Sequence, residues 1–287
     1  MPSRVVLITG CSSGIGLETA LAFARRGDTT FASMRNLAKA DALRSRARDE
    51  GLELEVVQLD VTDDASITAA VGEVGQRHGA IDVLVNNAGV GYDGAIETID
   101  IDRARAVFEA NVWGPIRVSR AAIPAMRARR SGAIINVTSV AGRVPGNAFM
   151  GFYSSSKHAM NTLGEALFDE LEPYGIRVVC IEPGFFSTEI ITNSDDLPRD
   201  SGPYRAQHEW MLDFYRKSVA SVGGHPSVVA DAIVAAADDP TTPVHVLVGE
   251  DAVSFVDLVT SLGTYEAWKP VGQQIVEGVS GPRPTET

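Results

Sequence analysis

Short apolar runs alternate with longer segments of helical period along most of the chain. The apolar runs are rich in Val, Ile and Leu and span residues 4–9, 29–33, 54–59, 81–85, 133–137, 176–181 and 244–248. Between them the apolar positions recur with a helical period, which predicts helices over residues 15–26, 37–50, 65–78, 103–129, 153–172 and 227–237. Near-continuous apolar strands separated by helices are typical of a parallel sheet covered on both faces. We therefore expect an α/β fold with a doubly wound parallel sheet of about seven strands.

Two segments interrupt this alternation. Residues 185–224 form a long insertion rich in aromatic side chains, and residues 278–287 have the Gly, Pro and Thr content of a frayed terminus. No internal repeat or low-complexity linker divides the rest. We expect a single domain over residues 1–277 with a lid-like insertion at about 185–224, followed by a flexible tail at 278–287.

Composition and charge exclude several classes of protein. The 287 residues are 45% hydrophobic and 22% charged, which is ordinary for a globular protein with a large core. A formal net charge of −12 argues against nucleic-acid binding. The two cysteines, Cys11 and Cys180, have no metal-ligand spacing, so we expect reduced thiols and no metal site. The first apolar run is too short for a signal peptide or a membrane span, which favours a cytoplasmic protein.

A glycine-rich turn follows the first apolar run. The sequence TGCSSGIG places Gly10, Gly14 and Gly16 between the first strand and the first helix, with Ser12, Ser13 and Ile15 among them. Glycines there permit a tight turn and the close approach of a diphosphate to the helix N-terminus. A simple left-handed turn is the alternative. The position of the glycine-rich turn within a strand–helix–strand pattern favours a Rossmann-like dinucleotide site.

The end of the second strand bears on the choice of dinucleotide. In NAD-binding folds an acidic residue at this position accepts hydrogen bonds from the adenosine ribose. This chain instead has Arg35 at that position, and Asp28 lies before the strand, at the wrong end. A guanidinium forms charge-assisted hydrogen bonds with phosphate, which favours NADP(H), with NAD(H) possible. Alternatively, Arg35 is a solvated surface residue.

The stretch FYSSSK places Tyr153 and Lys157 four residues apart. On a helix, positions i and i+4 share one face, so both side chains can reach one cavity. A nearby cation stabilises a phenolate and lowers the phenol pKa, which would make Tyr153 a general acid or base. Surface residues at helical spacing are the alternative explanation. His158 is turned about 100° away along the helix, so we expect it to pack or face solvent.

Seven motifs occur in the order found in short-chain dehydrogenases/reductases, and the chain resembles that family from Val5 to about Thr188. The motifs are TGCSSGIG, LDV at Leu59 to Val61, NNAG at Asn86 to Gly89, FEANVWG around Asn111, INVTS ending at Ser139, YSSSK, and PGFFST at Pro183 to Thr188. The spacing of the glycines resembles the single-domain oxidoreductase branch. Arg35 after CSSGIG resembles the NADP-using hydroxysteroid dehydrogenases in particular.

The resemblance implies a catalytic tetrad of Asn111, Ser139, Tyr153 and Lys157. Tyr153 would donate a proton to a carbonyl oxygen, and Ser139 would hydrogen-bond the same oxygen. Lys157 would lower the Tyr153 pKa and bind the nicotinamide ribose, and the Asn111 amide would hold a water that links Lys157 to solvent. Hydride would arrive at the carbonyl carbon from the pro-S face of the nicotinamide.

The resemblance also implies which residues bind the cofactor. Asp60 and Val61 would hold the adenine, and Ser13 and Arg35 would face the 2′-phosphate. The ribose and the nicotinamide side would be lined by Asn87, Ala88 and Gly89. The carboxamide would be bound by Pro183, Gly184 and Thr188.

These features predict an NADP(H)-dependent oxidoreductase that interconverts a hydrophobic ketone or aldehyde and an alcohol. The aromatic residues Trp210, Phe214 and Tyr215 fall where a substrate lid would lie, with Phe149 and Met150 opposite. Two alternatives stay open, an NAD-dependent alcohol or hydroxysteroid dehydrogenase and a non-catalytic dinucleotide-sensing regulator. In this family the helices corresponding to 103–129 and 153–172 form the usual two-fold contact, so we expect a homodimer or homotetramer.

Overall fold

Seven parallel strands form one sheet in the order β3-β2-β1-β4-β5-β6-β7. The computed structural model describes residues 3–188 and 201–285. Within them the strands are β1 Val5–Ile8, β2 Thr29–Met34, β3 Glu55–Gln58, β4 Val83–Asn86, β5 Gly132–Val137, β6 Ile176–Pro183 and β7 His245–Val248. Each lies in or overlaps one predicted apolar run. The predicted α/β fold with a Rossmann-like, doubly wound parallel sheet is confirmed.

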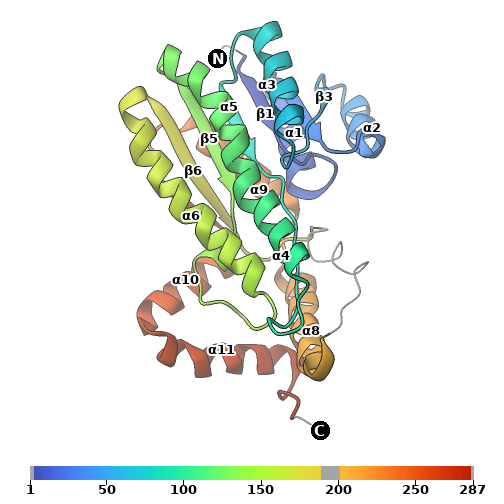
Figure 1. The fold of residues 1–287 in the computed structure, drawn as a ribbon, viewed down its shortest axis with the longest axis vertical. Coiled ribbons are helices and arrows are strands. Elements are labelled where there is room, and N and C mark those ends of the chain that lie inside the picture. Colours follow the sequence, from blue (N-terminus) through green and yellow to red (C-terminus); the bar gives the residue numbers. More distant parts are fainter. Residues whose placement is uncertain (1–2, 189–200, 286–287) are drawn as a thin grey trace.

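Helices cover both faces of this sheet, as Figure 1 shows. They are α1 Gly14–Arg25, α2 Asp41–Asp49, α3 Asp64–His78, α4 Ile101–Phe108, α5 Gly114–Arg129, α6 Gly151–Leu171, α8 Arg205–Val222, α9 Pro226–Asp238, α10 Glu250–Leu262 and α11 Tyr265–Ser280. One face packs against α1, α2 and α9, and the other against α3, α5 and α6. The strands are buried on both sides, which explains why they read as continuous apolar runs.

The predicted helix over residues 103–129 is interrupted in the structure. A π-helical turn at Glu109–Trp113 separates α4 from α5. The wider turn contains Asn111, whose side chain is buried and hydrogen-bonded to neighbouring segments. Such turns are rare and occur often at functional sites. The predicted helix over residues 37–50 is also divided, into a 3₁₀ turn at Leu37–Lys39 and α2.

The C-terminal region contains more helix than the sequence pattern predicted. The helices α8, α10 and α11 were not predicted, and in Figure 1 α11 runs across the lower end of the molecule and meets α8 at its C-terminal end. The predicted start of the flexible tail at residue 278 is too early, because α11 continues to Ser280. The Gly281 carbonyl then accepts a hydrogen bond from the Trp210 indole at 2.9 Å. Residues 189–200 of the predicted insertion lie outside the described residues.

The strand order brings the predicted site residues to one edge of the sheet. The chain order reverses between β1 and β4, which is where ligands bind in open α/β sheets. Gly10, Arg35, Asp60, Asn87 and Ser139 each follow the carboxyl end of a different strand. Among residues 3–188 and 201–285, no helix is both long and apolar enough to cross a bilayer.

Candidate active site

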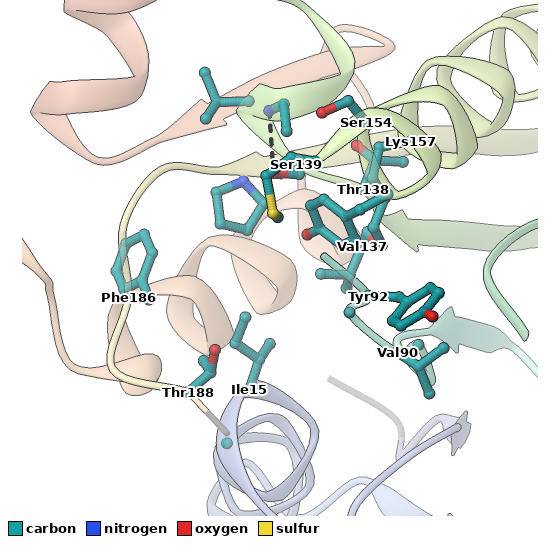
Figure 2. A pocket seen from close by; sticks show the side chains of 18 of the residues that line it. Ile15, Val90, Tyr92, Val137, Thr138, Ser139, Ser154, Lys157, Phe186 and Thr188 are labelled. Atoms are coloured by element: carbon teal, nitrogen blue, oxygen red, sulfur yellow. Dashed lines mark hydrogen bonds between the residues drawn. The ribbon is translucent and has the colours of Figure 1, made fainter. Parts of the chain in front are cut away.

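A cavity of about 430 Å³ opens at the carboxyl ends of the strands. Its lining includes all the predicted site residues except Gly16 and Asn111, namely Gly10, Ser12, Ser13, Gly14, Ile15, Arg35, Asp60, Val61, Asn87, Ala88, Gly89, Ser139, Tyr153, Lys157, Pro183, Gly184 and Thr188. Figure 2 shows Ile15 and Thr188 beside the start of α1, apart from Ser139, Ser154 and Lys157. The structure therefore brings the predicted dinucleotide residues and the predicted catalytic residues into one cavity.

The glycine turn between β1 and α1 depends on the absence of side chains. Gly10 and Gly14 have φ values of +76° and +56°, in the left-handed region that favours glycine. A Cβ atom at Gly10 would lie 2.8 Å from the Ala88 Cα. A Cβ atom at Gly16 would lie 2.3 Å from the Gly10 carbonyl oxygen, so Gly16 serves the packing of α1 against the turn rather than the cavity wall. No side chain caps the first turn of α1, which suits an anionic ligand there.

Asn87 fixes this turn against the end of β4. Its amide nitrogen donates to the carbonyls of Thr9 at 2.9 Å and Gly10 at 3.1 Å. The Thr9 hydroxyl in turn accepts from the backbone nitrogens of Asn87 and Ala88, each at 3.0 Å. The backbone around Ala88 and Gly89 is thereby held close to the glycine turn.

Two cations follow β2. Arg35 is exposed and lines the cavity, as predicted. Lys39, which belongs to none of the motifs above, is also exposed and lines the same cavity. The intervening turn is held by Asn36, whose side chain accepts from the Ala38 nitrogen at 3.0 Å. The signal for Lys39 was present in the sequence, because it stands four residues after Arg35 on a segment without carboxylates.

Tyr153 and Lys157 lie in the first two turns of α6, as their spacing predicted. The Lys157 ammonium lies 5.7 Å from the centroid of the Tyr153 ring and donates to the Val137 carbonyl at 3.1 Å. Ser139 follows β5, and its hydroxyl accepts from the Ala141 nitrogen at 3.1 Å, capping a short 3₁₀ turn. The same hydroxyl interacts with the Tyr153 phenol. Ser139 therefore has both the capping role and the contact with Tyr153.

Burial dominates the pKa values of both Tyr153 and Lys157. Burial raises the pKa of the Tyr153 phenol, and the hydrogen bond from Ser139 lowers it by less. Lys157 was expected to lower the Tyr153 pKa, but in the protein without cofactor the net result is a raised pKa. Burial lowers the pKa of Lys157 from 10.5 to about 8, because a buried ammonium loses its hydration.

Asn111 is held by protein groups on every side. Its amide nitrogen donates to the Val90 carbonyl at 2.9 Å and to the Ser156 hydroxyl at 3.0 Å, and its side-chain oxygen accepts from the Val90 nitrogen at 2.8 Å. Both amide hydrogens are thus donated within the protein, so a water on this side chain would have to bind at its oxygen, and that role stays a prediction. A Cβ atom at Gly89 would lie 3.0 Å from the Asn111 side-chain oxygen. Asn111 therefore positions the loop after β4 against α6.

Aromatic and aliphatic side chains enclose the end of the cavity beyond Tyr153. The Phe185 ring meets the rings of Phe214 at 6.1 Å, Tyr215 at 6.2 Å and Phe255 at 6.3 Å, all edge to face. Phe214 and Tyr215 line the cavity as predicted, as does Met150. Trp210 does not line it, because its indole is directed to Gly281.

The two C-terminal helices supply cavity residues that sequence reasoning missed. These are Phe255 from α10 and Trp268, Gly272, Ile275 and Val276 from α11. A signal existed, since Trp268, Gly272, Ile275 and Val276 stand at positions i, i+4, i+7 and i+8 and share a helical face. A Cβ atom at Gly272 would lie 3.0 Å from the Trp268 ring, so the glycine leaves room for the indole.

A buried histidine, His208, which belongs to no sequence motif, links α8 to the loop after β4. His208 contacts the Asp93 carboxylate through Nε2 at 2.6 Å and the Ser201 hydroxyl through Nδ1. The Phe149 ring, which the sequence placed opposite the lid, stacks on His208 at 4.8 Å. Phe149 has a φ of +68°, an uncommon conformation for a bulky residue. His158, by contrast, is exposed, and its ring contacts the Ser154 carbonyl of its own helix.

Comparisons with known proteins agree with this geometry. The sequence model of the family described as short chain dehydrogenase matches residues 4–197. Oxidoreductase BOA17 of Botryotinia fuckeliana (strain B05.10) is 35% identical over 254 residues, which cover 88% of this chain and 91% of that protein. Retinol dehydrogenase 8 of Homo sapiens is 36% identical over 242 residues, covering 80% of this chain and 76% of that protein.

Solved structures give the same result. The actinorhodin polyketide ketoreductase with NADPH superposes with a TM-score of 0.74 at 31% identity, covering 85% of this chain and 95% of that one. A short chain dehydrogenase/reductase from Burkholderia phymatum in complex with NAD superposes with a TM-score of 0.80 at 25% identity, covering 90% and 93%. The chain is therefore an oxidoreductase that belongs to the short-chain dehydrogenase/reductase family.

Proposed function

We propose that the protein is an NADP(H)-dependent oxidoreductase that interconverts a hydrophobic ketone or aldehyde and the corresponding alcohol. The observation that carries the proposal is the cavity shared by the glycine turn and by Ser139, Tyr153 and Lys157. A dinucleotide held at the glycine turn would extend toward residues able to handle a proton. Bound there, the nicotinamide supplies or accepts the hydride.

The side chains divide the remaining work. The raised pKa of Tyr153 keeps its phenol protonated at neutral pH, ready to donate to a carbonyl oxygen. The Ser139 hydroxyl contacts that phenol and would hold the same oxygen. The Lys157 ammonium, with a pKa of about 8, is charged at neutral pH and favours the phenolate left after transfer. Asn111 holds the loop that carries Gly89 against the same helix.

Arg35 and Lys39 support the preference for NADP(H). Both are exposed cations on the cavity wall after β2, where a 2′-phosphate would be recognised. The two solved relatives described above hold NADPH and NAD, so either dinucleotide suits the family fold. The affinities for NADPH and NADH, measured by titration, decide between them. Arg35→Ala should weaken NADPH about tenfold relative to NADH, and an unchanged ratio would refute the preference.

The apolar far end of the cavity supports a hydrophobic substrate. Its walls come from α8, α10 and α11. One relative, retinol dehydrogenase 8, is named for retinol, which is an apolar alcohol. The direct test supplies NADPH and a panel of hydrophobic ketones and follows consumption of the cofactor. We expect turnover that Tyr153→Phe reduces by about 10²- to 10⁴-fold. Binding of NADPH without turnover of any ketone would instead favour a dinucleotide-sensing regulator.

We also propose a homodimer or homotetramer. The contact would use α4, α5, the π-helical turn between them and α6; Ile101 in α4 and Trp113 in the turn are 53% and 51% exposed. Ile123 and Leu167, in contrast, pack against the core beside the sheet. A sedimentation mass equal to one 30.5 kDa chain would refute the oligomer. The cytoplasmic location stays a prediction.

A further inference from the structure

One polar pair interrupts the apolar end of the cavity. The residues of α8, α10 and α11 that line it are Leu212, Phe214, Tyr215, Val219, Phe255, Trp268, Gly272, Ile275 and Val276. Tyr215 is the one residue among these with a hydroxyl group. Asn147, from the loop before α6, lines the same cavity. The two side chains meet, with the Asn147 amide nitrogen donating to the Tyr215 hydroxyl oxygen at 3.0 Å.

This contact leaves the Tyr215 proton available. The phenol oxygen accepts from Asn147, and within the described part of the chain Asn147 is its one hydrogen-bond partner. The hydroxyl hydrogen therefore has no acceptor among the described residues. Tyr215 is half-buried and lines the cavity, so this hydrogen can be donated to a group that enters the cavity.

The pair is held firmly in place. The Tyr215 ring packs edge to face on Phe185 at 6.2 Å and on Phe214 at 5.4 Å. Asn147 closes a turn in which its carbonyl accepts from the Met150 nitrogen at 3.2 Å, immediately before α6 begins at Gly151. Asn147 is thus anchored to the helix that carries Tyr153.

Tyr215 also lies within electrostatic reach of the reaction centre. Burial raises the pKa of Tyr215 to about 12, with smaller contributions from the phenol of Tyr153 and the carboxylate of Asp93. Its hydroxyl therefore stays protonated at any physiological pH. It can donate a hydrogen bond but has no acid–base role of its own.

We propose that Tyr215 and Asn147 recognise a second oxygen atom on the substrate, a hydroxyl, ether or carbonyl oxygen apart from the carbonyl that is reduced at Tyr153. This inference rests on the proposed function and narrows its substrate class to hydrophobic ketones or aldehydes that carry one further oxygen. An all-hydrocarbon skeleton would bury the Tyr215 hydroxyl without an acceptor, and a site built to pair with an oxygen discriminates against the analogue that lacks it.

The test compares benzylacetone with its ortho-, meta- and para-hydroxy and methoxy derivatives. These ketones share one skeleton and differ only in the second oxygen, and the methoxy compounds can only accept a hydrogen bond. We expect at least one oxygenated isomer to exceed benzylacetone in kcat/KM by about tenfold. In Tyr215→Phe that ratio should fall to about one. Tyr174→Phe, at an exposed tyrosine far from the cavity lining, is the matched control and should keep the wild-type ratio.

A binding measurement separates failure of this inference from failure of the proposed function. Titration of the tryptophan fluorescence, to which Trp268 in the cavity contributes, gives the affinity for each ketone without turnover. Tighter binding of an oxygenated isomer that Tyr215→Phe abolishes supports the pair even if no ketone is reduced. The inference is overturned if every oxygenated isomer behaves as benzylacetone does, or if Tyr215→Phe keeps the discrimination while its melting temperature matches the wild type.

Discussion

Lys157 is a buried cation, and its burial destabilises the folded protein in the absence of cofactor. The side chain is 5% exposed, and its pKa falls to about 8 from an unfolded value of 10.5. Below pH 8 the folded protein holds a buried ammonium and bears the full destabilisation. Between pH 8 and 10.5 the unfolded chain binds a proton that the folded protein does not, so the free energy of unfolding rises with pH.

Lys157→Met should therefore stabilise the protein while removing its activity. The lowered pKa corresponds to about 3 kcal/mol, and loss of the hydrogen bond to the Val137 carbonyl offsets about 1 kcal/mol of that. We expect a gain of about 2 kcal/mol at pH 7, measured by urea unfolding without cofactor, that disappears by pH 10.5. A variant less stable than the wild type at pH 7 would show that the ammonium is not destabilising.

Single residues differ in how well the sequence predicts them. Ser139, Tyr153 and Lys157 stand in motifs, and the strand order brings them together as predicted. Asn147 and Tyr215 belong to no motif, and they meet only because α8 folds over the loop before α6. The positioning contacts of Asn111 were not predicted for a related reason. Its partners, Val90 and Ser156, are distant in sequence and became identifiable only in the structure.

At the scale of elements, buried and half-buried polar contacts help to hold α8 over the cavity. His208 joins α8 to Asp93, and both side chains are at least nine-tenths buried. His208→Leu should cost about 2 kcal/mol of stability, since a hydrogen bond to a charged group is worth about 1.5 to 3 kcal/mol.

The same variant separates structure from function. Because His208 does not line the cavity but fixes a helix that does, KM for hydrophobic ketones should rise about tenfold while kcat changes less. Steady-state kinetics measure both. His158→Leu is the matched control, since that imidazole is exposed, and it should leave KM unchanged. A large fall in kcat with unchanged KM for His208→Leu would contradict the positioning role.

Elements built from long apolar or periodic segments were predictable, and those that depend on tertiary packing were not. The strands are buried on both faces, so their composition alone identified them. The π-helical turn at Glu109–Trp113 follows from the side-chain contacts of Asn111, which no helical period records. The helices α10 and α11 have shorter apolar stripes, which bury Ala252, Trp268 and Val276 and leave most other positions partly exposed.

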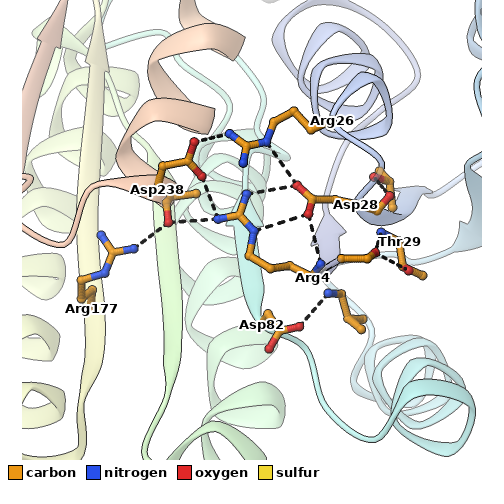
Figure 3. Close-up of polar contacts among 11 residues, drawn as sticks. Arg4, Arg26, Asp28, Thr29, Asp82, Arg177 and Asp238 are labelled. Atoms are coloured by element: carbon orange, nitrogen blue, oxygen red, sulfur yellow. Dashed lines mark hydrogen bonds and ion pairs between the residues drawn. The ribbon is translucent and has the colours of Figure 1, made fainter. Parts of the chain in front are cut away.

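Across the whole molecule, an ion-pair network joins the amino ends of the strands to the helix layer, opposite the cavity. Figure 3 shows Arg4, at the start of β1, between Asp28 and Asp238, with Arg26 contacting both carboxylates. Arg177 from β6 donates to the carbonyls that end α9. The Asp28 side chain is 5% exposed, so its ion pair with Arg4 is shielded from water.

Arg4→Met should therefore be costly. Removing the guanidinium leaves the buried Asp28 carboxylate with Arg26, whose nearest nitrogen is 3.6 Å away, and with the backbone nitrogen of residue 4 at 3.1 Å. We expect a loss of about 3 kcal/mol, near the lower end for breaking a buried pair. Arg105→Met removes an exposed pair with Asp102 and should cost less than about 1 kcal/mol. Equal losses for the two variants, measured by urea unfolding, would show that the network adds nothing beyond surface pairing.

The transfer of hydride to a carbonyl carbon is the central claim, and an isotope label tests it most directly. The enzyme is supplied with NADPH deuterated at the pro-S position of the nicotinamide C4 and with the best ketone of the panel, and the alcohol is examined by mass spectrometry. The account predicts one deuterium on the carbinol carbon, and product formation slowed by at least about 10²-fold in Tyr153→Phe. An alcohol without deuterium, or a Tyr153→Phe variant as fast as the wild type, would contradict it.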